Sequence, residues 1–230
     1  MSAPAIAIVP TELKPQFFDG LVPQARRAIL SAALPRRYPA NFVMTYHGHS
    51  ADHFFLLTRG LARYFFVTEQ GKKLLFQWIG PGDLFGGRAV LSRDTSYLLS
   101  TETVTESSVL VWERSTIRSL VGRYPRLLEN SLLTASDYLT WHLSSYVALA
   151  CYTSRHRVAL VLVTLARTIG QKVPGGIALR VTNEDLANAA NVTPFTASRL
   201  ISEWHRDHIL QKRRGKVLLR SPERLFLRTM

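Results

Sequence analysis

Cysteine is almost absent from this sequence of 230 residues, and acidic residues are few. The single cysteine, Cys151, excludes an internal disulfide and any cluster that needs four cysteines from one chain. No apolar run approaches the ~20 residues that span a bilayer. The first ten residues are uncharged and contain two prolines, which is unlike a signal peptide. We therefore expect a soluble, cytoplasmic protein without a membrane partner.

The scarcity of acidic residues leaves a strong and uneven positive charge. Lysine and arginine number 29 against 16 acidic residues, a formal net charge of +13. Residues 152–230 hold 14 of the basic side chains and 5 of the acidic ones, so this third of the chain carries most of the excess. Such a domain gains affinity for nucleic acid by neutralising phosphates and releasing counterions. The alternatives are a merely soluble basic surface and an anionic membrane partner.

Residues 182–206 have the pattern of two short helices that meet at a tight turn. Each helix has one apolar face, formed by Leu186, Ala187, Ala190 and Val192 in the first and by Ala197, Leu200, Ile201 and Trp204 in the second. Asn191 lies between them, where the turn needs a residue that tolerates the left-handed conformation. Thr193 and Pro194 then restart the chain as an N-cap and a proline at the first helical position. The pattern predicts a helix-turn-helix, whose second helix enters the major groove of DNA.

The segments around this motif predict the remainder of a winged domain. Arg157–Thr168 has a helical apolar face, and residues 170–176 form a turn-rich break. After the motif, residues 209–221 predict a hairpin with the basic tip Arg213, Arg214 and Lys216. A basic hairpin in this place is suited to contact with backbone phosphates.

Residues 38–112 have the pattern of a β domain. Short aromatic and aliphatic runs are separated by turns at Gly60, at Gly71 and at residues 80–83. This spacing is typical of a sandwich or a small barrel. A helix is expected before it, over residues 23–33, where apolar residues recur at helical spacing.

Residues 126–151 are expected to form one long helix with an apolar stripe. Alternating steps of four and three, the heptad pattern of a coiled-coil seam, separate Leu128, Leu132, Ala135, Leu139, His142, Tyr146 and Leu149. At 1.5 Å per residue this helix is roughly 40 Å long, which is more than one small domain needs and favours a dimer seam. A second apolar set is suited to packing the same helix on its own β domain: Leu127, Leu133, Tyr138 and Trp141.

The order of these elements resembles the Crp–Fnr family of transcription regulators over nearly the whole chain. The segment IGPGDLFGG resembles the family's β-roll motif near the effector pocket, and TASRL resembles its recognition helix. Tyr124-Pro125 is similar to the Asn-Pro step that opens the dimer helix. The resemblance implies an α+β fold with a cyclic-nucleotide-binding-like β-roll over 1–125, a dimerisation helix over 126–152 and a winged helix-turn-helix over 153–230. It also implies a homodimer on a palindromic operator, with RNA polymerase as a partner.

The sequence departs from the family members that bind cyclic AMP. Those members have a Gly-Glu pair in the pocket loop and, after it, an Arg-Ser pair that holds the cyclic phosphate. Here Gly86-Gly87 and Tyr97-Leu98 stand at these positions, and His142-Leu143 replaces the Thr-Ser pair that reaches the adenine. Without the glutamate and the arginine, an anionic sugar-phosphate is poorly held. We expect that cyclic AMP does not bind tightly.

The nature of any other effector stays open at this point. A more apolar pocket for a neutral or aromatic ligand is one interpretation, with the lining Phe85, Gly86, Gly87, Tyr97, Leu98, Trp141 and His142. In the other, these side chains fill the roll and there is no small-molecule effector. His142 on the seam is suited to fixing the register, to a pH switch, to a ligand contact or to haem ligation.

Metal and redox roles have weaker support in the sequence. His47, His49 and His53 suggest a metal or haem site, because some relatives bind haem through a histidine, but apart from Asp52 no carboxylate or cysteine pattern accompanies them. Cys151 is suited to a thiol sensor, although buried packing is the commoner role of a lone cysteine.

The recognition helix allows a sharper prediction about the operator. If its apolar face is buried, the opposite stripe is Phe195, Arg199, Ser202 and Arg206, flanked by Thr193, Thr196 and Ser198. Arg199 matches the family's arginine and is expected to contact guanine O6 and N7. Relatives have a glutamate at the position of Phe195, whose ring suits a thymine methyl instead. The alternative for Phe195 is packing on the Trp204 side of the helix.

Two classes of function follow. The first is a DNA-binding transcription regulator, either effector-gated or constitutive, and the second is an enzyme or a ligand-binding or signalling module on the same scaffold. Catalysis requires clustered acid, base and nucleophile candidates. The sequence has scattered histidines and no convincing carboxylate pair, so we expect a regulator and not an enzyme.

Overall fold

The computed structural model describes residues 15–91, 93, 95–213 and 215–227, and the side chains of Trp141, Phe226 and Leu227 are outside that description. The chain divides into two compact units. Unit 1 comprises Met1–Phe66 and Ile79–Thr140, and unit 2 comprises Val67–Trp78 and Trp141–Met230. No helix within the described residues is long and apolar enough to cross a membrane.

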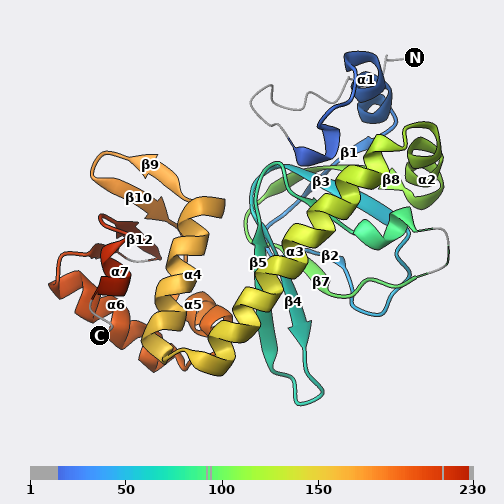
Figure 1. Cartoon of the computed structure of the whole chain (residues 1–230). Helices are drawn as coiled ribbons and strands as arrows, with labels where there is room; N and C mark the ends of the chain where they lie inside the picture. The colour runs from blue at the N-terminus through green and yellow to red at the C-terminus, as the bar shows by residue number, and fades with distance from the viewer. Residues whose placement is uncertain (1–14, 92, 94, 214, 228–230) are drawn as a thin grey trace. The chain divides into compact units, whose positions relative to one another are not determined.

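Eight strands in two antiparallel sheets form the β domain (Figure 1). One sheet has the order β1-β8-β3-β6, and the other has the order β2-β7-β4-β5. The strands are β1 (Leu34–Tyr38), β2 (Val43–Thr45), β3 (His53–Arg59), β4 (Ala62–Val67), β5 (Lys73–Ile79), β6 (Leu84–Phe85), β7 (Ser100–Thr103) and β8 (Ser107–Glu113). The sandwich or barrel that the glycine spacing predicts is therefore present as two sheets, and its strands begin four residues before the predicted boundary.

Short helices pack against this domain. They are the 3-10 helices η1 (Gln16–Phe18) and η2 (Gly87–Val90) and the α-helices α1 (Pro23–Ser31) and α2 (Arg114–Arg123). An aromatic cluster of Phe17, Phe54 and Trp112 joins them to the first sheet, and Trp112 Nε1 donates to the carbonyl of Ile29 at 2.8 Å. The predicted helix over 23–33 is confirmed as α1. The helix α2 is not predicted by the sequence analysis, because its apolar stripe is short and seven of its ten residues are serine, threonine, glycine or arginine.

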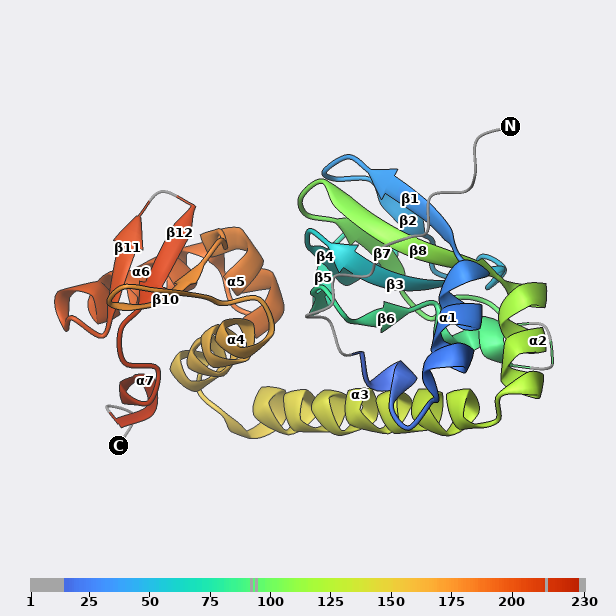
Figure 2. The same cartoon turned by 90° about the horizontal axis from the view of Figure 1, so that it is seen from above.

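The long predicted helix is α3 (Arg126–Cys151), and its bounds match the predicted range (Figure 2). Leu127 at its start is fully buried in the aromatic cluster. Tyr138 donates its hydroxyl hydrogen to the carbonyl of Leu84 at 2.9 Å, so these two members of the second apolar set do pack on the β domain. Leu133 does not, because its side chain is exposed.

The winged part of unit 2 combines helices with a four-stranded sheet of order β11-β12-β10-β9. Its elements are α4 (Ser154–Thr168), β9 (Gln171–Val173), β10 (Gly176–Leu179), α5 (Asn183–Ala190), α6 (Pro194–Arg206), β11 (Leu210–Arg213), β12 (Lys216–Leu219) and α7 (Arg224–Leu227). The helix-turn-helix and the basic hairpin are therefore present as predicted. The helix α4 begins three residues before its predicted start, because Thr153 caps it by accepting from the backbone N–H of His156.

The predicted break over 170–176 is wrong in part, since it contains strand β9 and the turn that leads into β10. Strand β10 pairs with β12, about forty positions further along the chain. Gly176 lies so close to the carbonyl of Leu219 that a Cβ atom there would collide with it. This pairing depends on distant residues, so the glycines look like a loop when only the local sequence is considered.

Arg157 connects the helix-turn-helix to the end of α3. Its Nε donates to the carbonyl of Ala190 at 2.9 Å, its Nη2 to the carbonyl of Asn191 at 3.1 Å, and its Nη1 to the carbonyl of Tyr152 at 3.0 Å. Carbonyls at the end of a helix have no partner within the helix, and a cation there also interacts favourably with the helix dipole. One planar guanidinium therefore holds the turn of the motif and the link between α3 and α4.

Replacing Arg157 with methionine keeps the aliphatic stem but removes the three hydrogen bonds. We expect a loss of about 2–3 kcal/mol in unfolding free energy, the range for a charged hydrogen-bond donor. Urea denaturation measures this loss, and hydrogen exchange at the α5 amides localises it. Arg157→Lys is expected to recover little stability, because an ammonium lacks the planar fork. The exposed Arg167 on the same helix supplies the control, Arg167→Met, and equal losses in both variants would contradict the role of the fork.

Candidate functional site

The turn between α5 and α6 has the backbone geometry that its sequence predicts. Asn191 has φ 48° and ψ 56°, which is the left-handed region, and the backbone N–H of Val192 donates to the carbonyl of Ala187 at 2.9 Å. Thr193 Oγ1 accepts from the backbone N–H of Thr196 at 3.1 Å, and Pro194 occupies the first helical position. The first helix begins with a capping box between Thr182 and Asp185. These caps determine where α6 begins and therefore which residues face outward.

The helix α6 buries one face and exposes the other. Its apolar residues Ala197, Leu200, Ile201 and Trp204 are all buried in unit 2. Phe195 is 79% exposed, so it does not pack on the side of Trp204. Arg199 and Arg206 are exposed as well, and Ser202 is half-buried because its hydroxyl donates to the carbonyl of Ser198. The stripe predicted to read DNA therefore lies on the surface.

Arg199 has a carboxylate partner that the sequence analysis missed. Its Nη1 donates to Glu203 Oε1 at 2.9 Å, and the other oxygen of Glu203 accepts from Arg155 Nη1 at 2.7 Å. The Arg155 guanidinium also lies 5.3 Å from the centroid of the Trp204 ring. The four-residue spacing of Arg199 and Glu203 on one helix is a signal that could have indicated the first contact. The contact with Arg155 joins two helices and leaves no such signal.

The wing presents basic residues at its tip. Arg213 and Lys216 are exposed and face each other across the register of β11 and β12. Arg214, which is also predicted to contact phosphates, lies outside the described residues. The exposed pair and the α6 stripe belong to the same compact unit.

The predicted effector-pocket residues have different environments. Phe85 is buried and stacks on Phe55 with ring centroids 4.5 Å apart. Tyr97 is buried in the same cluster, and its hydroxyl donates to the carbonyl of His53 at 3.1 Å. Burial raises the pKa of the Tyr97 phenol, while the backbone N–H of His53, which donates to the phenol oxygen at 3.0 Å, opposes the shift. Gly86 has φ 74°, and a Cβ there would meet the His53 carbonyl, so this position requires glycine.

The remaining members of that predicted set do not join this cluster. Leu98 is 65% exposed, Gly87 opens η2 with open space around it, and the side chain of Trp141 is outside the described part. His142 belongs to unit 2, where its ring meets Phe76 edge-on with centroids 6.0 Å apart. Burial lowers the pKa of the His142 imidazole.

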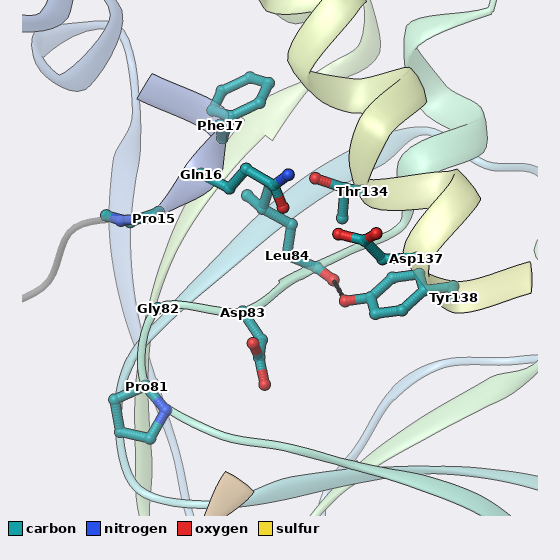
Figure 3. Close-up of a pocket in the computed structure, with 10 residues that line it drawn as sticks. All are labelled: Pro15, Gln16, Phe17, Pro81, Gly82, Asp83, Leu84, Thr134, Asp137 and Tyr138. Atoms are coloured by element: carbon teal, nitrogen blue, oxygen red, sulfur yellow. Dashed lines mark hydrogen bonds between the residues drawn. The ribbon is translucent and has the colours of Figure 1, made fainter. Parts of the chain in front are cut away.

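A cavity of about 350 Å³ opens elsewhere in unit 1 (Figure 3). Three segments line it: the start of the described chain, the turn before β6, and α3. The lining residues are Pro15, Gln16, Phe17, Pro81, Gly82, Asp83, Leu84, Thr134, Asp137 and Tyr138. Burial raises the pKa of the Asp83 carboxyl, although the backbone N–H of Gly80, 2.7 Å from its Oδ2, opposes the shift. This lining includes two carboxylates and no basic side chain, so it is unsuited to an anion.

An ion pair between β4 and β7, whose side chains are 16% exposed at Arg63 and 7% exposed at Glu102, also escaped the sequence analysis. Arg63 Nε lies 2.6 Å from Glu102 Oε1, and the two residues are directly paired in the strand register. The sequence offers no signal for it, since 39 positions separate the partners. This pair places charge inside the β domain at a position where the two ions satisfy each other.

The three candidate metal histidines each pack against a different aromatic ring. His47 lies against Phe66, His49 against Tyr46 and His53 against Phe55. Within the described residues, no group of three or more potential ligands could hold a metal ion. Cys151 is exposed, so the expectation of buried packing is wrong. It is the last residue of α3.

The exposed side of α3 is strongly apolar and broader than the predicted seam. Of that seam, Leu128, Leu132, Leu139, Tyr146 and Leu149 are exposed large hydrophobic residues. Leu133, Leu143 and Val147 are also exposed but lie outside it. His142 differs from the rest because its ring is half-buried beside Phe76. The exposed apolar side therefore includes most of the predicted stripe and extends beyond it.

Comparison with known proteins gives two domain matches. Residues 35–124 match the family model of the cyclic nucleotide-binding domain, and residues 156–226 match that of the Crp-like helix-turn-helix domain. Together the matches cover more than two thirds of the chain. A solved structure, FixK2 from Bradyrhizobium japonicum, is similar with a TM-score of 0.75 at 23% identity and covers 85% of this chain and 96% of its own.

Curated relatives are similar over most of their length. The CRP-like cAMP-activated global transcriptional regulator of Mycobacterium tuberculosis is 26% identical over 217 residues, which are 92% of this chain and 95% of the relative. The cyclic AMP receptor protein of Thermus thermophilus is 25% identical over 203 residues, 88% of this chain and 91% of the relative. With the helix-turn-helix and the two-sheet β domain described above, these matches show that the chain belongs to the Crp–Fnr family of transcription regulators, which bind DNA and are not enzymes.

Proposed function

We propose that the chain is a homodimeric regulator that binds a palindromic operator sequence-specifically and is gated by an effector other than cyclic AMP. The observation that carries the proposal is the outward face of α6, where Arg199 and Phe195 stand on the side opposite a fully buried apolar face. A helix that is anchored in this way can present base-reading side chains to the major groove. Arg213 and Lys216 at the wing then supply contacts to phosphates.

Each of the three parts that the sequence predicts has its own role in this proposal. Residues 1–125 serve as the sensor, residues 126–152 as the dimerisation helix, and residues 153–230 as the DNA-binding domain. In the DNA-binding domain Arg199 reads guanine, and Phe195 contacts a thymine methyl in place of the family's glutamate. The remaining contacts come from the helix start, the outer stripe and the wing: Thr193, Thr196, Ser198, Ser202, Arg206 and Arg214. RNA polymerase is a further partner on family grounds.

The apolar face of α3 supports dimerisation. Its large hydrophobic side chains are between 41% exposed at Leu128 and 70% exposed at Tyr146. Contiguous apolar surface of this kind marks an interaction site, and a two-fold axis lets the same face meet its copy. The partner is therefore a second copy of this chain.

Substituting Leu139 with aspartate places a charge in the middle of that face. We expect the dimer to dissociate, because an unpaired carboxylate is costly in an apolar interface, and operator affinity to fall with it. Light scattering after gel filtration measures the mass, and gel shift measures the affinity. Val22 is a comparably exposed aliphatic residue outside α3, so Val22→Asp is the control. A dimeric Leu139→Asp variant would contradict this seam.

The β domain supports an effector unlike cyclic AMP. Gly87, Tyr97 and Leu98 stand where relatives have the glutamate and the Arg-Ser pair, and none of them has a cationic side chain for a charge-assisted bond to the phosphate. The stacked rings of Phe55 and Phe85 occupy the core between the sheets. That filled core favours a second candidate, a constitutively active regulator without a small-molecule effector. A ligand-binding or signalling module without DNA contacts is the alternative in the other class.

Titration of the full chain with cyclic AMP tests whether cyclic AMP is the effector. Calorimetry is expected to show no saturable heat at micromolar ligand, because Tyr97 and Leu98 replace the Arg-Ser pair that holds the phosphate in relatives. Selection of bound sites from a random DNA pool, with and without the small-molecule fraction of a cell extract, then tests for another effector. Binding of cyclic AMP at micromolar or lower concentration would overturn this part of the proposal.

Arg199→Ala tests the reading of DNA. The expected cost is about 1–3 kcal/mol in specific binding, with preference relaxed at one base pair of each half-site. Arg213→Ala on the wing is expected to weaken all sequences alike and to reduce the salt slope by about 1. Gel shifts over a salt series measure both quantities. An Arg199→Ala variant with unchanged sequence preference would show that α6 does not read the operator in this orientation.

A further inference from the structure

The arginine proposed to read guanine is the exposed end of a three-residue ionic chain. Arg155 on α4 donates to one oxygen of Glu203, and the other oxygen accepts from Arg199, at 2.7 and 2.9 Å. The side chains of Arg155 and Glu203 are 24% exposed, whereas that of Arg199 is 56% exposed. These three side chains therefore connect Arg155, which is largely buried on α4, with Arg199 on the surface of the recognition helix.

The anchor is held by packing as well as by charge. The Arg155 guanidinium lies over the ring of Trp204, which is fully buried, with 5.3 Å between Cζ and the ring centroid. A cation over an indole face is attracted by the ring quadrupole. Arg155 also neutralises part of the carboxylate charge of Glu203. Glu203 is consequently fixed in direction from both sides.

The contact with Glu203 uses only one of the two edges of the Arg199 guanidinium that could bind a base. Its bond to Glu203 uses Nη1. The fork that matches guanine O6 and N7 is a pair of parallel N–H donors, and Nε with Nη2 forms such a pair on the other edge of the guanidinium. An exposed arginine without a partner loses much rotamer freedom when it binds a base. A carboxylate that already holds one edge reduces that loss.

We infer that Glu203 and Arg155 are positioning residues that set Arg199 in place before DNA arrives, and that they thereby determine specificity at the guanine step. The inference rests on the proposed function, in which Arg199 reads that base. Neither residue touches DNA in this scheme. Their effect passes through the orientation of Arg199 alone.

Glu203→Gln is the central variant, because glutamine keeps the shape but loses the charge. Removing a negative charge from a DNA-binding domain raises affinity for every sequence, so affinity alone is a misleading measure. The informative readout is base preference at each position, obtained by selection from a duplex pool with a randomised centre. We expect preference for guanine at the Arg199 step to fall about three- to tenfold, part of the ~5- to 150-fold that a bidentate contact carries. Glu223→Gln removes the same charge at an exposed site of the same unit and is the control.

Arg155→Met tests the anchor from the other helix. Arg155→Met is expected to lower the preference for guanine at the Arg199 step. Arg167→Met, at the exposed end of α4, is expected to leave that preference unchanged. In an Arg199→Ala background, neither Arg155→Met nor Glu203→Gln is expected to change preference further, because both act through Arg199. Thermal unfolding of each variant shows whether the domain remains folded.

The outcomes separate the inference from the function on which it rests. If Arg199→Ala relaxes one step and Glu203→Gln leaves that step unchanged, the positioning role is wrong and the reading of guanine stands. If Arg199→Ala relaxes no step, the proposed reading itself fails. An equal loss at all steps in Glu203→Gln would indicate a general structural role and would also overturn the inference.

Discussion

The burial of one face of α6 is the constraint on which the rest of the DNA-binding surface depends. Ala197, Leu200, Ile201 and Trp204 are removed from water together, and each buried large side chain contributes on the order of 1.5–3 kcal/mol. A helix has a period of 3.6 residues, so fixing this face also fixes the opposite one. Rotating α6 to hide Phe195 or Arg199 would expose Trp204. The outward stripe is thus a consequence of the core.

That constraint explains why the winged part could be predicted closely from sequence. Caps, helical periodicity and the left-handed residue Asn191 are local signals, and each acts within a few positions along the chain. The bounds of α3 follow in the same way from its long apolar repeat. Agreement between several local signals in one segment is the condition under which a sequence specifies its structure most clearly.

The sites that depend on distant residues were predicted less well. The ion pair of Arg63 and Glu102, the contact of Arg155 with Glu203, and the pairing of β10 with β12 all join segments far apart in the sequence. The periodicity of apolar residues along the chain cannot predict such contacts. The proposed effector lining illustrates the same limit, because Phe85 and Tyr97 are core residues while Leu98 is exposed. Motif position alone did not reveal which of these side chains face inward.

The helix α3 has one side packed on the β domain and another side that is apolar and exposed. Leu127 and Tyr138 attach it to the β domain, while a separate apolar side remains in water in the single chain. A 26-residue helix offers enough turns for both faces. Within the predicted stripe, His142 differs because it packs beside Phe76, while the next residue, Leu143, is exposed.

The carboxylate of Glu203 lowers the affinity of the domain for all DNA and, in our proposal, raises its specificity. Residues 152–230 carry nine more basic than acidic side chains, and a carboxylate on the reading helix opposes their attraction to phosphates. That cost falls on every DNA sequence alike, since phosphates carry no sequence information. If Glu203 offsets this loss of affinity, it must do so by favouring one DNA sequence over others. Orientation of Arg199 satisfies that requirement, because a bidentate contact favours guanine only when its two donors are correctly aligned.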